Sequence, residues 1–334
     1  MAIESKSNVQ LGVVPTHLKF VGGLVPDEQG RIPRGDGGLL VVENMKKLCE
    51  QSQVRIDAVQ IPYFPGLDEG DVKEMVDGLK GLGLTVHFIL MVGGADPMNP
   101  ADEDAVVDML VGGLKAAAAH GVEHVSSTSV EEWMQAGATP KEGDAFDAAV
   151  AQNVKVHTRA VKEAGIEGSS IKGWHFEFLR GGEFQTFTDI NKAWTFVKAA
   201  NKALGKKFFH VMVDAAHCGD SSLSIPENEA TIAEIGEAGA FGIFHASAKT
   251  TRGCLSTDDG WIGALLTACA KTGKMHTCLV EVFHHEDPAL EGLRNLEPGH
   301  GLDTTDGRSY DEVVIDGLHE TAHRLNNLVT RGVL

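Results

Sequence analysis

Four apolar runs of strand length in the second half of the chain each end at a side chain that can bind a metal ion or move a proton. They are residues 171–176 before Glu177, 208–213 before Asp214, 240–244 before His245 and 276–280 before Glu281. A charged group at the end of a buried strand costs free energy unless it is paired or bound to a metal. The four positions are 37, 31 and 36 residues apart, close to the length of one strand plus one helix. In a parallel barrel built from such units, all four side chains would lie at the same rim.

Two glutamates, one aspartate and one histidine form a ligand set that suits Mn²⁺, Co²⁺ or Mg²⁺ better than a structural zinc ion. Such an ion, with coordination positions left open, can chelate neighbouring substrate oxygens, polarise a carbonyl and stabilise an enediolate. Glu177 and Glu281 could then remove a proton from one face of the substrate and return one at the other face. His217, three residues after Asp214, and Arg252, in the loop after the seventh strand, are placed to hydrogen-bond a hydroxyl or enediolate oxygen.

Strand-like and helix-like segments alternate along the whole chain. We predict strands at 11–20, 56–61, 84–92, 122–127, 171–178, 208–213, 240–245 and 276–283, and helices at 39–50, 71–80, 100–119, 144–164, 189–204, 226–238, from about 257, and at 310–329. This alternation fits either a closed (β/α)8 barrel or a doubly wound open sheet. Since the chain has no GxGxxG turn after its first strand and no Walker loop, we predict an α/β protein with a (β/α)8 TIM barrel. No composition break divides the chain, so residues 1–334 are expected to form one barrel domain.

Composition narrows the classes of function. Of the 334 residues, 43% are hydrophobic and 23% charged, as in an ordinary globular protein with a full core. The net charge of −18 repels phosphate backbones and anionic lipids, which argues against nucleic-acid and membrane partners. Because no apolar run approaches the roughly 20 residues of a membrane helix and the first residues resemble no signal peptide, we expect a cytoplasmic enzyme. Five scattered cysteines without a CxxC pair indicate neither a disulfide framework nor a cysteine zinc site.

The ordered set of residues resembles the xylose-isomerase-like barrels, and within them the ketose 3-epimerases and hydroxypyruvate isomerase. The shared pattern is a Glu on the fifth strand, Asp-x-x-His on the sixth, a His on the seventh followed by an Arg, and a Glu on the eighth. Here these residues are Glu177, Asp214 with His217, His245 with Arg252, and Glu281.

The resemblance implies a role for each of these side chains. One divalent metal ion would be bound by Glu177, Asp214, His245 and Glu281. The ion would be Mn²⁺ by preference, with Co²⁺, Mg²⁺ or Zn²⁺ as alternatives. Glu177 and Glu281 would also be the acid–base pair, while His217 and Arg252 would hold a small sugar.

The match covers residues 170–285, whereas the first half of the chain matches only in its rhythm of strands and helices. Gln60 ends the second strand where these proteins often carry an acidic residue. Residues 22–37, 131–143 and 285–307 make the chain longer than a typical epimerase. Both differences bear on the choice of substrate rather than on the metal.

Some of these side chains also have a plainer interpretation. A lone aspartate at a strand end, such as Asp214, is more often a helix cap than a metal ligand. His17, near the end of the first strand, either lines the substrate pocket or is a histidine of the barrel rim. His175, two residues before Glu177, faces the same side of its strand and is interpreted as a core or supporting group.

We therefore predict a divalent-metal-dependent isomerase or epimerase that acts on a small ketose or related carbonyl sugar through an enediolate. The alternatives are a lyase or dehydratase that uses the same enediolate, an endonuclease-IV-like phosphodiesterase, and a sugar-binding protein without catalysis. The phosphodiesterase would need a multi-zinc cluster with more histidines and a basic DNA face, neither of which the sequence offers. The barrel family and the extra loops also favour a homo-oligomer.

Overall fold

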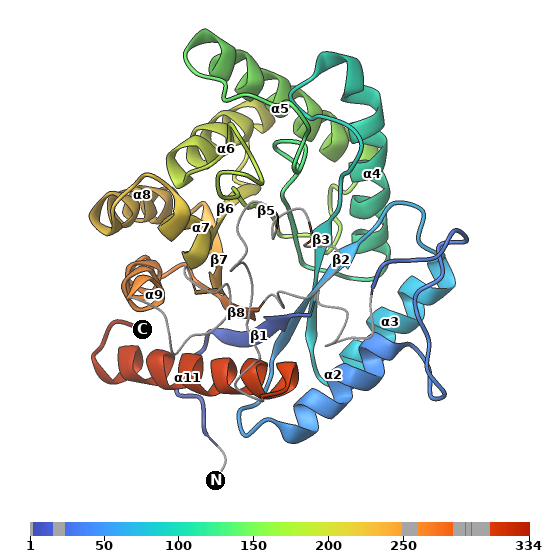
Figure 1. Ribbon diagram of the computed structural model, residues 1–334, viewed down its shortest axis with the longest axis vertical. Helices are drawn as coiled ribbons and strands as arrows, with labels where there is room; N and C mark the ends of the chain where they lie inside the picture. Colours follow the sequence, from blue (N-terminus) through green and yellow to red (C-terminus); the bar gives the residue numbers. More distant parts are fainter. Residues whose placement is uncertain (1–2, 16–23, 249–259, 283–290, 292–294, 296–307) are drawn as a thin grey trace.

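The computed structural model describes residues 3–15, 24–248, 260–282 and 308–334, together with positions 291 and 295. Its centre is a closed barrel of parallel strands that follow one another in chain order (Figure 1). The strands are β1 (Gln10–Val14), β2 (Ala58–Tyr63), β3 (Thr85–Leu90), β4 (His124–Ser127), β5 (Gly173–Phe176), β6 (Phe209–Asp214), β7 (Phe241–Ala246) and β8 (Thr277–Glu281). Pairing of β1 with β8, which sets Val14 opposite Glu281, closes the ring. The predicted (β/α)8 barrel is confirmed.

Helices surround the barrel on its outside (Figure 1). They are α2 (Leu40–Gln51), α3 (Glu69–Gly81), the 3-10 turn η1 (Pro100–Asp102), α4 (Glu103–Ala119), α5 (Asp144–Ala164), α6 (Ile190–Leu204), α7 (Ala215–Asp220), α8 (Ile225–Ala238), α9 (Trp261–Lys271) and α11 (Tyr310–Thr330). Asp189 caps α6 by accepting a hydrogen bond from the backbone N–H of Lys192 at 2.9 Å. Ser224 and Ser309 each form a capping box with the glutamate three residues later. These caps fix where the helices begin.

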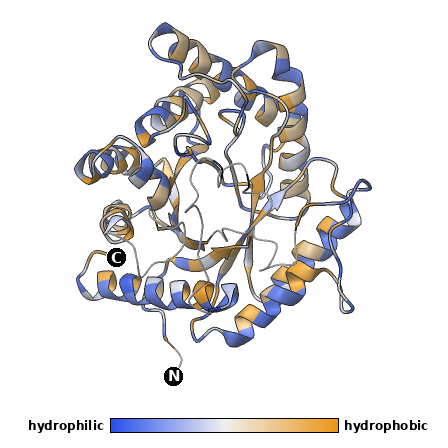
Figure 2. Cartoon of the chain, in the orientation of Figure 1, coloured by the Kyte–Doolittle hydropathy of each residue, from blue (hydrophilic) through white to orange (hydrophobic). Residues whose placement is uncertain are grey.

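The strands are covered on both faces. Their outward side chains belong to the same hydrophobic cluster as the buried faces of the helices, which carry hydrophilic residues on their other side (Figure 2). Inside the barrel, a smaller apolar cluster is formed by Val14, Ala58, Ile89, Met212, Ile243 and Leu279. Burial on both faces explains why the strands read as nearly continuous apolar runs. Among the helices that the structure describes, none has both the length and the apolar composition needed to cross a bilayer.

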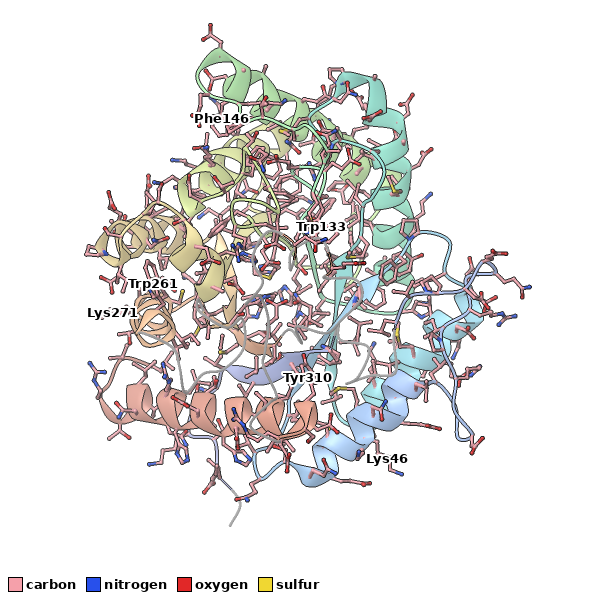
Figure 3. All side chains as sticks on the ribbon, in the orientation of Figure 1. Lys46, Trp133, Phe146, Trp261, Lys271 and Tyr310 are labelled. Atoms are coloured by element: carbon pink, nitrogen blue, oxygen red, sulfur yellow. The ribbon has the colours of Figure 1, made fainter. Side chains whose placement is uncertain are left out.

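The last helix, α11, closes the outer ring. It contacts β8 and β1 as well as the neighbouring helices α2 and α9. Tyr310, in its first turn and labelled in Figure 3, donates a hydroxyl hydrogen bond to the backbone carbonyl of Val282. Because Val282 directly follows Glu281, this contact holds the end of β8 in place.

The chain departs from the sequence prediction on either side of the candidate residues. The short helix α7 begins directly after Asp214, where the sequence pattern indicated a loop. Asp214 caps this helix, since its Oδ1 accepts a hydrogen bond from the backbone N–H of His217 at 2.8 Å. β5 ends at Phe176 rather than at residue 178, so Glu177 is the first residue beyond the strand. The cap uses only one carboxylate oxygen of Asp214, and the other remains available.

Candidate metal centre

The structure brings together four side chains from the carboxyl ends of β5, β6, β7 and β8. They are Glu177, Asp214, His245 and Glu281, and one ligand atom from each lies within 4.8 Å of the others. His245 Nδ1 lies 3.1 Å from Glu281 Oε2, 3.5 Å from Glu177 Oε1 and 3.8 Å from Asp214 Oδ2. Strand register contributes to this arrangement, because Asp214 and His245 are direct partners in the pairing of β6 with β7. The four side chains share one rim of the barrel.

These four residues are buried, and the exposed fraction of each residue is at most 6%. Three carboxylates and one imidazole hold an excess of negative charge, which is costly in a buried site unless a cation neutralises it. Two carboxylate oxygens, Glu177 Oε1 and Asp214 Oδ2, are buried without a hydrogen-bond partner. Buried polar atoms normally have a partner, so their presence needs an explanation. The unpartnered oxygens and the uncompensated charge together fit a divalent cation, which would take its oxygens from the carboxylates.

The pKa values of these side chains also indicate that the site requires positive charge. Burial raises the pKa of Asp214 to about 7; nearby His217 opposes this rise, and the negative charges of Glu281 and Glu177 add to it. Burial also acts to raise the pKa of Glu177, but His245 and His217 more than offset it and bring this pKa below its usual range. Burial disfavours the charged form of His245, yet Glu281 and Glu177 raise its pKa well above the ordinary value. Protons on Asp214 and His245 therefore neutralise part of the negative charge of the site. A bound metal ion would replace these protons.

Gln60, in the middle of β2, fixes the orientation of His245. His245 Nε2 lies 2.8 Å from Gln60 Oε1, and Gln60 Nε2 donates a hydrogen bond to Ser126 Oγ at 2.8 Å. Ser126 Oγ in turn donates to the backbone carbonyl of Phe88 at 3.3 Å. Since an amide oxygen only accepts hydrogen bonds, His245 carries a proton on Nε2, and Nδ1, which faces the carboxylates, is the nitrogen at which a metal ion could replace a proton. Hydrogen bonds of this kind orient the imidazole ligands of metal sites.

The sequence identified Gln60 only as a departure from the pattern of the resembling family. Its hydrogen bond to His245 joins residues 185 positions apart and crosses the interior of the barrel. The one signal in the sequence was a polar residue inside an otherwise apolar strand. Gln60 is fully buried, so that signal did indicate a side chain with specific partners.

His217 lies beside the four candidate ligands. Its Nε2 is 3.5 Å from Glu177 Oε1, and its side chain is 2% exposed. The other two residues that the sequence assigned to substrate binding, His17 and Arg252, lie outside the described residues. His175 is fully buried inside the barrel and contacts other histidines, described below.

No protein-family model matches the sequence, and no curated protein matches it. Solved structures match over nearly the whole chain. The D-allulose 3-epimerase of Methylomonas sp. in complex with D-allulose is 16% identical, with a TM-score of 0.71 over 97% of this chain and 99% of that one. An L-ribulose 3-epimerase is also 16% identical, with a TM-score of 0.71 over 97% and 96% of the two chains. The IolI protein with a binding zinc atom is 12% identical, with a TM-score of 0.59 over 96% and 98%.

At these identities the likeness concerns the fold. The strands and helices of this chain follow the same path as those of sugar 3-epimerases over almost their full length. The protein thus has a closed (β/α)8 barrel whose fold is shared with these sugar 3-epimerases.

Proposed function

We propose that this protein is a divalent-metal-dependent isomerase or epimerase that moves a proton on a small ketose or related carbonyl sugar. The observation that carries the proposal is the buried set of three carboxylates and one imidazole at the carboxyl end of the barrel. Active sites of TIM barrels form at this end. Support also comes from the shared fold with sugar 3-epimerases, one of which was solved with D-allulose.

The metal ligands in this proposal are Glu177, Asp214 through Oδ2, His245 through Nδ1, and Glu281. A set dominated by carboxylates favours Mn²⁺, with Co²⁺, Mg²⁺ or Zn²⁺ as further candidates, and IolI, a protein of the same fold, was solved with zinc. When bound, the ion would polarise the substrate carbonyl and stabilise the enediolate. Gln60 would hold a proton of His245 on Nε2 and direct Nδ1 toward the ion, which would replace the proton on Nδ1.

Glu177 and Glu281 are the proposed acid–base pair. Glu177 is ionised at neutral pH because its pKa is depressed, so it can accept a proton from a substrate carbon. The C–H bond breaks, its electron pair enters the enediolate, and the proton moves to the carboxylate. Glu281, on a strand three places further round the barrel, would return a proton to a carbon from the other side. Return to the same carbon from the opposite face gives an epimer, and return to the neighbouring carbon gives an isomer.

The neighbouring residues would hold the sugar. His217 lies next to Glu177, so a substrate oxygen near the carboxylate would come within reach of its ring. We propose that Arg252 and His17 also bind substrate oxygens. Fixed donors of this kind favour the enediolate because its oxygens carry more negative charge than those of the substrate.

The experiment that tests the proposal is proton exchange. The purified protein is loaded with Mn²⁺ and incubated in D2O with a panel of ketoses, and NMR locates any deuterium bound to carbon. We expect incorporation at C3 for an epimerase, or at C1 or C2 for an isomerase. Loss of water would instead assign the enediolate to lyase chemistry, and binding of a sugar without any exchange would assign the site to a sugar-binding protein. Either of those outcomes contradicts the proposal.

A further inference from the structure

The opposite, amino-terminal end of the barrel carries a second cluster of side chains that can ligate metal. Five histidines from β3, β4, β5, β6 and the residue before β8 have their rings close together: His87, His124, His175, His210 and His276. The ring centroids of His124 and His276 are 4.3 Å apart, and those of His175 and His210 are 4.8 Å apart. Along β6, the apolar Met212 separates His210 from Asp214 of the first centre. The histidine cluster is therefore a separate group.

Three of these histidines have the geometry of a metal site. One ring nitrogen each of His124, His175 and His276 lies within 4.8 Å of the others. His124 Nδ1 and His175 Nε2 are 3.2 Å apart. In a tetrahedral site with zinc–nitrogen bonds of about 2.0–2.1 Å, two ligand nitrogens are about 3.3 Å apart. We propose that His124, His175 and His276 form a second metal site, which takes a zinc-like divalent ion at the amino-terminal end of the barrel.

Hydrogen bonds account for only part of the cluster: His124 Nδ1 pairs with His175 Nε2, and His276 Nδ1 lies 2.9 Å from Thr277 Oγ1. His87 is fully buried, and neither of its ring nitrogens has a hydrogen-bond partner. Nδ1 of the fully buried His175 and Nδ1 of His210 also lack one. Apolar side chains would pack the same space without this cost, so the imidazoles point to a ligand. His87 stacks on His124 with ring centroids 5.5 Å apart, and a water molecule would supply the fourth position of a tetrahedral ion.

The backbone makes room for these rings at two glycines. A Cβ atom on Gly242 of β7 would lie 2.3 Å from His276 Nε2 and 2.9 Å from His175 Cε1. A Cβ atom on Gly173 of β5 would lie 2.9 Å from the ring of His210. Any side chain at either position would push an imidazole out of its place. The histidine cluster thus depends on glycines from two separate strands.

The protonation state of the cluster also suits metal binding. Burial lowers the pKa of His175 well below its ordinary value, with the neighbouring histidines adding to the effect. Burial is also the main cause that lowers the pKa of His124 to about 2 and that of His276 to about 4. Neutral imidazole is the form that binds metals. His124 and His276 are only half-buried, which gives an ion a route from solvent.

The ligand set selects a class of ion. Imidazole nitrogens suit Zn²⁺, Co²⁺, Ni²⁺ and Cu²⁺, whereas Mg²⁺ and Mn²⁺ prefer oxygen. The amino-terminal end of a TIM barrel serves stability rather than chemistry. An ion here would join β4, β5 and the start of β8 across the barrel interior. Its role would be structural, and it does not depend on any reaction at the other end.

Zinc content measured by mass spectrometry after dialysis of the untagged protein against Zn²⁺ tests the site. We expect two ions per chain in the wild type, one in Glu177→Gln/Glu281→Gln, and one in His124→Gln/His276→Gln. The control His323→Gln, which removes an exposed histidine of α11, should keep two. Equal zinc content in wild type and His124→Gln/His276→Gln would overturn the site. Because no substrate is used, the result is independent of the proposed sugar chemistry.

A second measurement avoids the histidine variants, which could fail to fold. Glu177→Gln/Glu281→Gln protein with one equivalent of Zn²⁺ is examined by X-ray absorption spectroscopy. Three or four imidazole nitrogens at about 2.0–2.1 Å are the expected first shell. A shell of oxygens, or one with fewer than three imidazoles, would contradict the proposal. Zinc should also raise the melting temperature of this variant, because it binds only the folded state.

Discussion

The two ends of this barrel carry different chemistry on the same strands. At the carboxyl end, β5, β6 and β8 supply Glu177, Asp214 and Glu281, with a single imidazole from β7. At the amino end, β5 and β6 supply His175 and His210, and His276 stands directly before β8. Along β5 and the residue that follows it, the two kinds of residue are only two positions apart, at 175 and 177. A step of two residues along the chain therefore separates a residue of the carboxylate centre from one of the histidine cluster.

Because of this difference in residue type, one cluster requires positive charge to balance it and the other does not. The carboxylate centre is negatively charged and buried, so it needs a cation or protons. The histidines lose their charge through burial, so they can remain in the interior without a counter-ion. Negative charge suits the carboxylate centre to a hard cation, and neutrality suits the histidine cluster to a nitrogen-preferring ion.

The largest expected effect comes from removing a carboxylate of the proposed acid–base pair. Glu177→Gln and Glu281→Gln keep the size of the side chain but cannot exchange protons, so each should slow deuterium incorporation into the substrate by about 10²–10⁴-fold or more. Glu234→Gln, at an exposed position of α8, is the control and should keep the wild-type rate. If the Glu177→Gln variant incorporated deuterium at the wild-type rate, Glu177 would have no role in proton transfer.

Removal of the metal ion by a chelator tests whether the negatively charged carboxylate centre depends on a cation for stability. Removing Mn²⁺ would leave the carboxylate centre without the proposed counter-ion, and at a free ion concentration 100 times Kd the lost stabilisation would be about 2.7 kcal/mol. Thermal unfolding with and without EDTA should show a melting temperature several degrees lower in the chelated protein. The double variant Glu177→Gln/Glu281→Gln should show little response to Mn²⁺. An equal response in both proteins would place the stabilising Mn²⁺ somewhere else.

Substitution of Gln60 tests how much its hydrogen bond to His245 contributes to metal affinity at the carboxylate centre. Gln60→Leu leaves His245 Nε2 without an acceptor, so the Mn²⁺ affinity should fall by about 10–100-fold. Gln60→Glu keeps an acceptor oxygen at the same position and should bind Mn²⁺ more tightly than Gln60→Leu. A calorimetric titration of the three proteins measures both differences. Unchanged affinity in Gln60→Leu would mean that His245 is oriented by other contacts.

His157, a buried histidine of α5 outside both clusters, gives a reference for the pH dependence. Burial lowers its pKa to about 4, although hydrogen bonds with Asn153 and Ser129 oppose the shift. Between pH 6.5 and about 4 the unfolded chain binds a proton here that the folded chain does not, so stability is complete above pH 6.5 and is lost on acidification.

The loss due to His157 should be about 1.4 kcal/mol per pH unit within this window. His157→Phe removes the titrating group in a pocket that contains Trp174, Phe176 and Phe196. Urea unfolding at several pH values, with chelator present, should give a shallower decline for this variant than for the wild type. Parallel declines would show that His157 does not contribute to acid sensitivity.

The sequence was sufficient to predict the barrel and the set of strand-end residues. Each strand is a local apolar run, and a polar residue at its end is visible without knowledge of the fold. Parallel pairing then brings the ends of neighbouring strands together, as the register of Asp214 with His245 illustrates. These predictions depended on the chain order alone.

Contacts across the barrel interior could not be predicted in this way. The hydrogen bond of Gln60 to His245 and the stacking of His124 on His276 each join strands that are far apart in sequence. The space for the histidine rings depends on Gly173 and Gly242, whose effect appears only when the barrel is closed. The helix that Asp214 caps was missed because α7 has only six residues and no periodic pattern.

The central claim is that Glu177, Asp214, His245 and Glu281 hold one divalent ion. Anomalous diffraction from crystals grown with Mn²⁺, recorded on both sides of the manganese absorption edge, tests it most directly. The account predicts one strong manganese peak in contact with all four side chains, and its loss in crystals of Glu177→Gln/Glu281→Gln. A fully loaded crystal without a peak at this position, or with manganese only elsewhere, would contradict the account.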